Sequence, residues 1–136
     1  MQESKDDVDE DRNSLAEAID VIEETYEFML AYAAQGRRGD DDGDIRRRLV
    51  RAETALAFMA AVTPAALGGA GKAEAAGEFV AVLKQDAARA AAAFRFVLAQ
   101  GAIGSQIVDN LNVSTPVRTV LTDIFLLDEA LKISGI

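Results

Sequence analysis

The chain has no cysteine and no histidine, and only two of its 136 residues are proline. Without cysteine there can be no disulfide, no thiolate nucleophile and no sulfur-ligated metal. Without histidine the commonest general base is missing, which excludes Ser-His and Cys-His catalysis and most zinc or haem sites. We therefore expect no metal, no cofactor and no catalytic activity.

Long apolar runs are also missing. No segment approaches the roughly 18 uninterrupted apolar residues that a membrane-spanning helix needs. The first residues, MQESKDDVDEDR, have neither the basic start nor the apolar core of a signal peptide. We expect no membrane insertion and a cytoplasmic location. The net charge of −9 further argues against a whole-surface attraction to nucleic acid or to anionic lipid.

The composition of the chain favours α-helix. Half of its residues are apolar, alanine is abundant, and the period-two alternation of strands is hard to find. The length is that of one domain with an ample core. The sequence predicts an all-α, single-domain bundle of four main helices plus one short helix.

An acidic segment precedes this bundle. Residues 1–12 have few apolar side chains to bury, and we predict that they form a disordered tail. The bundle domain is then residues 13–136. Its first helix is predicted to start at a capping box, Ser14 with Glu17, and to end before Gly36. The inward stripe predicted for this helix is Leu15, Ala18, Ile19, Ile22, Tyr26, Met29, Leu30 and Ala33.

Four further helices follow from periodicity and breakers. We predict helices over 44–62 and 73–100, with a flexible connection from Pro64 onward. A short helix over 103–111 and a last helix over 117–133 complete the bundle, with Thr115 as N-cap and Pro116 in the first turn. The expected inward residues of the second and third helices are Ile45, Leu49, Ala52, Leu56, Met59, Phe79, Leu83, Ala90, Phe94 and Val97.

The last helix is apolar on two sides. On a helical wheel, Leu126 and Ile133 lie nearly opposite the main apolar arc. Such a helix is either central in the bundle or part of an interface with a protein partner or a second copy. The main arc is predicted to contain Val117, Val120, Leu121, Ile124, Phe125, Leu127 and Leu131.

The charged connection between the first two helices does not fit a known ligand loop. With Gly43 at position 6 of an EF-hand, position 1 would be Arg38 and position 12 would be Leu49, neither of which is a ligand. A Walker loop would need a lysine and a preceding strand, and both are missing. A solvated turn between helices is one interpretation.

Arginines favour a second interpretation of the same region. Cations in the first turn of a helix are disfavoured by its dipole, so their concentration there invites a functional reason. Arginine is suited to bidentate capture of carboxylates. We expect a docking patch for an acidic protein surface, or for the acidic tail, formed by the arginine cluster of Arg37, Arg38, Arg46, Arg47, Arg48 and Arg51.

Some polar residues of the predicted helices are candidates for a metal site or a ligand pocket. The acids Asp20, Glu23, Glu24 and Glu27 have no histidine to complete a di-iron pattern and fit a solvated face. Asp86 interrupts the apolar side of its helix and could bond to Tyr26 or Tyr32 inside the bundle, or form a polar point in a ligand pocket there. Nucleic-acid binding has little support, because the arginines lack aromatic platforms.

The function expected from these features is that of a non-catalytic accessory, regulatory or assembly protein that acts through protein contacts. A homodimer is one form that such contacts could take. The first alternative is a bundle that binds a small apolar ligand between the first, third and last helices. An enzyme using acidic or tyrosine side chains is the third.

Overall fold

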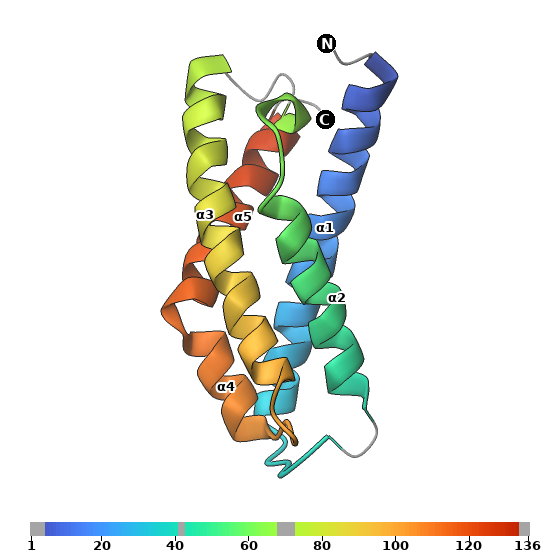
Figure 1. Cartoon of the computed structure of the whole chain (residues 1–136), viewed down its shortest axis with the longest axis vertical. Helices are drawn as coiled ribbons and strands as arrows, with labels where there is room; N and C mark the ends of the chain where they lie inside the picture. The colour runs from blue at the N-terminus through green and yellow to red at the C-terminus, as the bar shows by residue number, and fades with distance from the viewer. Residues whose placement is uncertain (1–4, 41–42, 68–72, 134–136) are drawn as a thin grey trace.

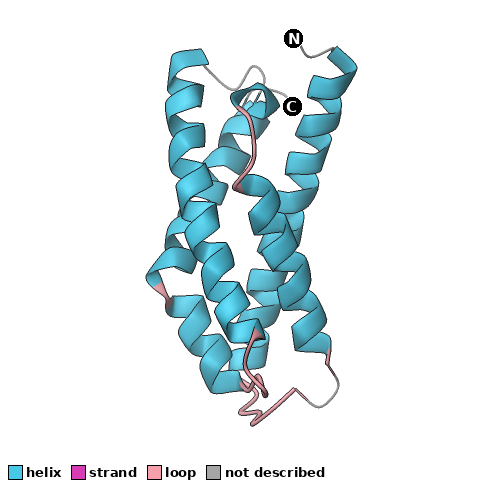
Figure 2. Ribbon diagram, in the orientation of Figure 1, coloured by secondary structure: helices cyan, strands magenta, loops and turns pink. Residues whose placement is uncertain are grey.

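The computed structural model describes residues 5–40, 43–67 and 73–133, with side chains from Ser14 onward in the first range. Within these residues the secondary structure is helical throughout, and no strand occurs (Figure 2). This confirms the predicted all-α bundle of four main helices and a short one. The elements are α1 (Lys5–Ala33), α2 (Asp44–Met59), the 3-10 turn η1 (Pro64–Leu67), α3 (Ala73–Leu98), α4 (Ser105–Val113) and α5 (Thr115–Ile133).

The helices form four antiparallel columns along the long axis of the molecule (Figure 1). α1 and α3 run in one direction, α2 runs in the other, and α4 and α5 follow one another along the fourth column. α3 packs mainly against α2 and α5, and α1 packs mainly against α2 and α4. The α1–α2 and α3–α4 connections therefore meet at the same end of the bundle, which we call the base (Figure 1).

The core forms where the apolar stripes of the helices meet. Every inward residue predicted for α2 is buried, and so are those of α3 except Phe79, which is partly buried. On α3, the side chains of Ala87, Ala90 and Ala91 are buried as well. Small side chains there allow the neighbouring helix to approach closely.

The first helix begins earlier than predicted. α1 starts at Lys5, so the prediction that the capping box at Ser14 starts the helix was wrong. The sequence before Ser14 is rich in aspartate and glutamate, residue types that the dipole of a helix favours at its N-terminal end. Of the predicted acidic tail, residues 1–4 lie outside the described part of the chain.

The connection after α2 is also more ordered than predicted. α2 ends at Met59, and Pro64–Leu67 forms a 3-10 turn. Ala66 and Leu67 are buried in the core, so this part of the predicted flexible connection packs against the bundle. Proline is well placed at the start of such a turn because its missing N–H has no partner to lose.

A break divides the fourth column into α4 and α5. Ser114 adopts an extended conformation with ψ 146°. Its carbonyl accepts a 3.0 Å hydrogen bond from the Arg118 N–H, so Ser114, rather than the predicted Thr115, is the N-cap of α5. In an uninterrupted helix the ring of Pro116 would clash with the carbonyl of Asn112. Pro116 therefore explains why the fourth column consists of two helices rather than one continuous helix.

Two residues predicted to face the core are exposed. Leu30 on α1 is 47% exposed and Phe125 on α5 is 51% exposed. Both line a hollow beside Asn112 and Val113 at the end of α4. A helical wheel gives the direction of a side chain but not whether a neighbour covers it, and the break leaves this part of both helices uncovered.

Close backbone packing holds the two connections together at the base. The Ser105 N–H donates a 2.8 Å hydrogen bond to the Arg37 carbonyl. A Cβ atom placed on Gly104 would lie 2.7 Å from the carbonyl oxygen of Arg37 and 2.9 Å from that of Arg38. Only glycine fits this approach without movement of the backbone.

We expect Gly104→Ala to lower the free energy of unfolding by about 1–3 kcal/mol, the usual cost of overpacking. Urea denaturation monitored by circular dichroism measures the change. Gly101→Ala is the matched control, because a Cβ at Gly101 would meet nothing within 4 Å. Equal losses in the two variants would contradict the close approach.

Candidate functional site

The start of α2 is hydrogen-bonded to the C-terminal end of α3. The Arg46 guanidinium donates hydrogen bonds of 3.1 Å to the Leu98 carbonyl and 2.6 Å to the Gln100 carbonyl. It also forms an ion pair with Asp40. Carbonyls at the C-terminal end of a helix carry partial negative charge. The dipole of α3 therefore favours the cation of Arg46, which the dipole of α2 disfavours.

Asp40 links Arg46 to the segment before α4. Its Oδ1 accepts a 2.8 Å hydrogen bond from the Ile103 N–H. That hydrogen bond, together with the Arg46 guanidinium, holds the pKa of Asp40 below its usual value. Asp40 is therefore ionised and joined to both connections at the base. We call Asp40, Arg46, Ile103 and the carbonyls of Leu98 and Gln100 the basal clasp.

Tyr32 adds a second set of contacts beside the basal clasp. The carbonyls of Ile103 and Gly39 lie 2.6 Å and 3.1 Å from its hydroxyl, which donates to them. The Ser105 hydroxyl donates a 2.6 Å hydrogen bond to the Tyr32 carbonyl and accepts one of 2.8 Å from the Arg37 N–H. Tyr32 is fully buried. It joins α1 to the start of α4.

The remaining arginines do not form one open patch. Arg47 and Arg48 each lie 3.4 Å from a carboxylate oxygen of Asp44, and the Arg48 guanidinium lies 4.1 Å from the centre of the Phe28 ring. The Arg37 guanidinium is 5.4 Å from the centre of the Tyr32 ring. Because Arg46 serves the basal clasp, the predicted docking of an acidic partner depends on the exposed members, Arg37, Arg38, Arg47 and Arg51.

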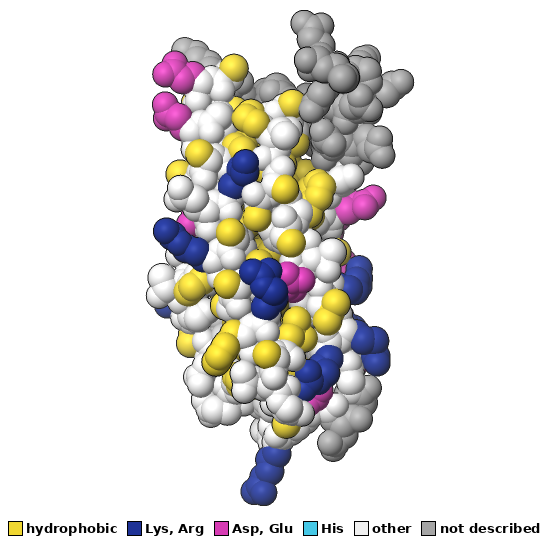
Figure 3. Space-filling model, viewed as in Figure 1, with side chains coloured by type: hydrophobic (Ala, Val, Ile, Leu, Met, Phe, Trp, Pro, Cys, Tyr) yellow, Lys and Arg dark blue, Asp and Glu magenta, His cyan; other side chains and the backbone are white. Residues whose placement is uncertain are grey.

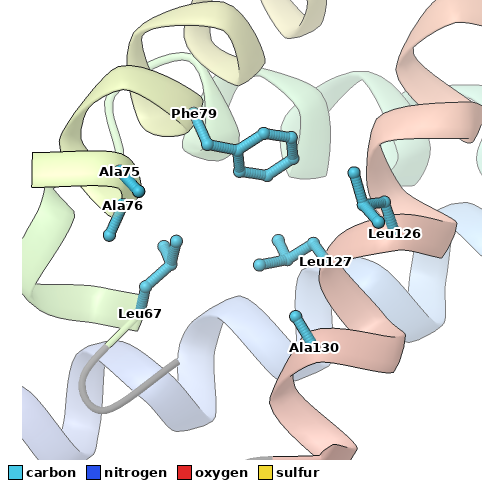
Figure 4. Close-up of a pocket in the computed structure, with 7 residues that line it drawn as sticks. All are labelled: Leu67, Ala75, Ala76, Phe79, Leu126, Leu127 and Ala130. Carbon is cyan, nitrogen blue, oxygen red and sulfur yellow. The ribbon is translucent and has the colours of Figure 1, made fainter. Parts of the chain in front are cut away.

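A groove of about 260 Å³ lies between α3 and α5, beside η1 (Figure 4). The side chains of Phe79, Leu67 and Leu127 converge on it from three elements (Figure 4). At its edge Leu126 is 62% exposed, and Ile133, two helical turns further along α5, is 79% exposed. The residues that line this groove are all apolar: Leu67, Ala75, Ala76, Phe79, Leu126, Leu127 and Ala130.

Leu126 and Ile133 are thus exposed, in agreement with their predicted outward position. α5 still buries its other apolar side, which includes Val117, Val120 and Ile124. The second apolar side is not covered by the rest of the described chain. An exposed apolar surface beside a groove is typical of a binding site for a protein or a ligand.

α5 also brings carboxyl groups next to carboxyl groups of other helices. Asp123 shares a hydrogen bond with Asp86 of α3, and burial together with this neighbour raises the pKa of Asp123 to about 7. Burial and the nearby Asp128 raise the pKa of Glu23 on α1 as well. Two like charges lie this close only at a cost, so Asp123 keeps its proton to a higher pH than an exposed aspartate does.

The predicted pocket residues do not come together. Asp86 meets Asp123 and, at 3.8 Å, Arg89 rather than a tyrosine. Tyr32 bonds to backbone carbonyls at the base, and Tyr26 lines a different hollow between α1 and α5. The predicted Asp–Tyr hydrogen bond was therefore wrong. Spacing along one helix cannot reveal that an acid on another helix lies opposite.

Metal binding and membrane insertion find no support in the described residues. No set of three or more acidic, histidine or cysteine side chains there is grouped to hold a metal ion. Among the helices of this part of the chain, none combines the length and apolar character that crossing a membrane requires.

No family model matches the chain, and comparison with curated proteins and with solved structures gives no match. The function must therefore be argued from the sites themselves.

Sequence reasoning missed two of the residues on which these sites depend. Asp40 lies in the loop interpreted as a solvated turn, and no role is assigned to Asp123 from the sequence. Their partners, Ile103 and Asp86, are distant in sequence. One local signal pointed to the basal clasp: the unfavourable position of Arg46 at a helix N-terminus requires a compensating partner.

We expect Arg46→Met to lower the free energy of unfolding by about 2–3 kcal/mol, because it removes charged hydrogen bonds and leaves Asp40 without its cation. Thermal and urea unfolding measure the loss. Arg47→Met is the matched control, since the side chain of Arg47 is 68% exposed, and it should change stability by less than about 0.5 kcal/mol. Similar losses in both variants would show that Arg46 has no special role.

The raised pKa of Asp123 predicts that stability falls as pH rises. An unfolded aspartate releases its proton near pH 4, whereas Asp123 in the fold keeps it until a pKa of about 7. Between these values the folded state binds the extra proton, so the free energy of unfolding decreases with increasing pH and levels off above the upper value. We expect a lower melting temperature at pH 8 than at pH 5.

Asp123→Asn should flatten this dependence, because the amide cannot ionise. Asp109→Asn, at an exposed position of α4, should leave it intact. Glu23, whose pKa is also raised, contributes a remaining slope of the same sign. A slope in Asp123→Asn as steep as in the unmodified chain would contradict the raised pKa of Asp123.

Proposed function

We propose that this chain is a non-catalytic accessory or assembly protein, and that the groove between α3 and α5 receives an amphipathic helix of a partner protein. The observation that carries the proposal is the wholly apolar lining of the groove, with Leu126 exposed at its edge. A polypeptide helix offers the complementary shape. Such helices bind grooves through apolar residues spaced at i, i+3, i+4 and i+7.

The dimensions of the surface support a helix rather than a single side chain. The groove itself accommodates one or two apolar anchors. Ile133 lies seven residues beyond Leu126 and extends the apolar surface by about 10 Å along α5. A partner helix with apolar residues over two turns would cover both.

Charge supports a basic partner. Glu74 and Glu78 are exposed in the first turns of α3, and Glu129 is exposed next to Ala130 on α5. Figure 3 shows acidic side chains over the upper end of α3. The exposed basic residue nearest in sequence on α3 is Lys84, and Lys132 on α5 lies 3.4 Å from a carboxylate oxygen of Asp128. The excess of acid favours a helix whose apolar stripe is flanked by lysine or arginine.

The same charges disfavour a second copy of this chain as the occupant. A two-fold symmetric contact places the same surface of each protomer face to face. It would bring Glu74, Glu78 and Glu129 of one protomer close to those of the other, in two chains that each carry a net charge of −9. A basic partner helix has no such cost.

Other functions have weaker support. A small apolar ligand held by Tyr26, Tyr32 and Asp86 would need these residues around one cavity, and each has other neighbours. Docking of an acidic surface on Arg37, Arg38, Arg47 and Arg51 stays a prediction, as does the cytoplasmic location. Catalysis forms no part of the proposal.

A labelled helical peptide tests the groove directly. The probe carries leucines at i, i+3, i+4 and i+7 and lysines on the opposite face, and its binding is followed by fluorescence anisotropy. We expect Leu126→Glu to weaken binding at least about tenfold, because it places a charge at the edge of the apolar groove. Phe96→Glu is the matched control: it adds the same charge at an exposed position of α3 outside the groove and should leave the affinity unchanged.

Three results would contradict the proposal. The first is equal binding of a scrambled peptide of the same composition, which would indicate charge attraction alone. The second is equal weakening by Leu126→Glu and Phe96→Glu. The third is a stable dimer by light scattering that Leu126→Glu dissociates, which would make a second copy the occupant of the groove.

A further inference from the structure

The outer surface of α2 and α3 has no exposed acidic side chain over most of its length. We call the exposed side chains of residues 47–61 and 81–99 the α2–α3 face. Its charged members are all basic: Arg47, Arg51, Lys84, Arg89 and Arg95. The chain as a whole has 23 acidic and 14 basic residues. The α2–α3 face therefore has the opposite charge to the rest of the molecule.

The two acidic residues within these ranges do not change this charge. Glu53 accepts a 2.7 Å hydrogen bond from Arg95, which joins α2 to α3. Asp86 is buried and faces Asp123 on α5. The α2–α3 face thus presents a positive charge to solvent, and such a surface attracts anionic groups.

Apolar side chains lie among the basic ones. Val50 on α2 is 50% exposed and Phe96 on α3 is 69% exposed. Ala57, Ala88 and Ala92 are exposed as well, at spacings that place them on the same side of their helices as these two residues. Figure 3 shows hydrophobic side chains along α2 and α3, with basic side chains between them. An exposed apolar surface along two packed helices is typical of an interaction site.

A second copy of this chain does not complement the α2–α3 face, although the outer side of α1 has the opposite charge. The exposed acidic residues of α1 after Ser14 are Glu17, Asp20, Glu24 and Glu27. No exposed apolar side chain lies between them. Docking of α1 would therefore bury carboxylates against Val50 and Phe96, at a cost in desolvation.

An extended polyanion is also a poor match. An anionic membrane or a nucleic acid would meet the acidic surfaces of a chain with a net charge of −9. A single helix contacts only the surface that it covers. Charge and apolar surface together therefore favour a helix with both acidic and apolar side chains.

We propose that the α2–α3 face binds an acidic amphipathic helix of a partner protein, with its apolar side against Val50 and Phe96 and its carboxylates near Arg51 and Arg89. Residues 81–99 extend about 27 Å along α3, the length of a helix of about five turns. Arginine suits carboxylates because its planar guanidinium donates two parallel hydrogen bonds. The α2–α3 face shares no residue with the lining of the α3–α5 groove, so this inference does not depend on the function proposed for the groove.

A labelled acidic peptide tests the α2–α3 face. The probe has leucines at i, i+3, i+4 and i+7 and glutamates beside them, and fluorescence anisotropy follows its binding to the full chain. We expect Val50→Glu to weaken binding at least about tenfold, because it places a carboxylate on the apolar part of the face. Val113→Glu is the matched control: Val113 is 56% exposed on α4, and the same added charge there should leave the affinity unchanged.

Two further variants test the charge and the independence of the two surfaces. Arg51→Gln should weaken the acidic peptide about threefold, whereas Arg118→Gln, which removes an exposed arginine from α5, should not. Phe96→Glu should weaken the acidic peptide and leave binding of the basic peptide to the α3–α5 groove unaffected. All these positions are exposed, so the helical circular dichroism should be preserved.

Several outcomes would overturn the inference. Equal binding of a scrambled acidic peptide would indicate charge attraction without a docked helix, and equal weakening by Val50→Glu and Val113→Glu would indicate that the α2–α3 face has no special role. Weakening by Leu126→Glu but not by Val50→Glu would place the acidic peptide in the α3–α5 groove. Binding to phosphatidylglycerol vesicles, or a dimer by light scattering, that Val50→Glu abolishes would make a membrane or a second copy the occupant.

Discussion

The contact of Arg46 with the end of α3 is the interaction on which the arrangement of this bundle depends. Its guanidinium joins the start of α2 to the last carbonyls of α3 and, through Asp40, to the segment that leads into α4. A cation at the start of a helix is unfavourable within that helix, and the neighbouring helix end reverses the balance. Because Tyr32 and Ser105 add α1 to the same end of the molecule, all four columns are fixed relative to one another at the base.

The local features of the chain were predictable from sequence, and its long-range pairs were not. Periodicity located α2, α3 and α5 and their buried sides, because the angular position of each side chain follows from helix geometry alone. The same reasoning placed Leu126 and Ile133 outward. It failed for Phe125 and Leu30, whose exposure depends on where a neighbouring helix ends. It also failed for Asp40, whose partner Ile103 lies 63 residues away, since nothing local specifies that pairing.

The two hollows have different structural causes. Between α3 and α5 the helices diverge beside η1, and apolar side chains line the opening. At the end of α4, proline stops the helix before its column is complete, and a buried amide remains in the wall. The groove has only apolar chemistry, whereas the hollow at the end of α4 combines apolar surface with the guanidinium of Arg118.

α5 is a wall of both hollows. Residues 126–130 face the groove beside α3, and residues 118–125 face the cavity beside α1. α4 and α5 are separate helices, so α5 need not keep the direction of α4. Any rigid displacement of α5 toward α3 narrows the first hollow and widens the second, and a displacement toward α1 does the reverse. Among the described helices, α5 is therefore the one whose position bears on both hollows.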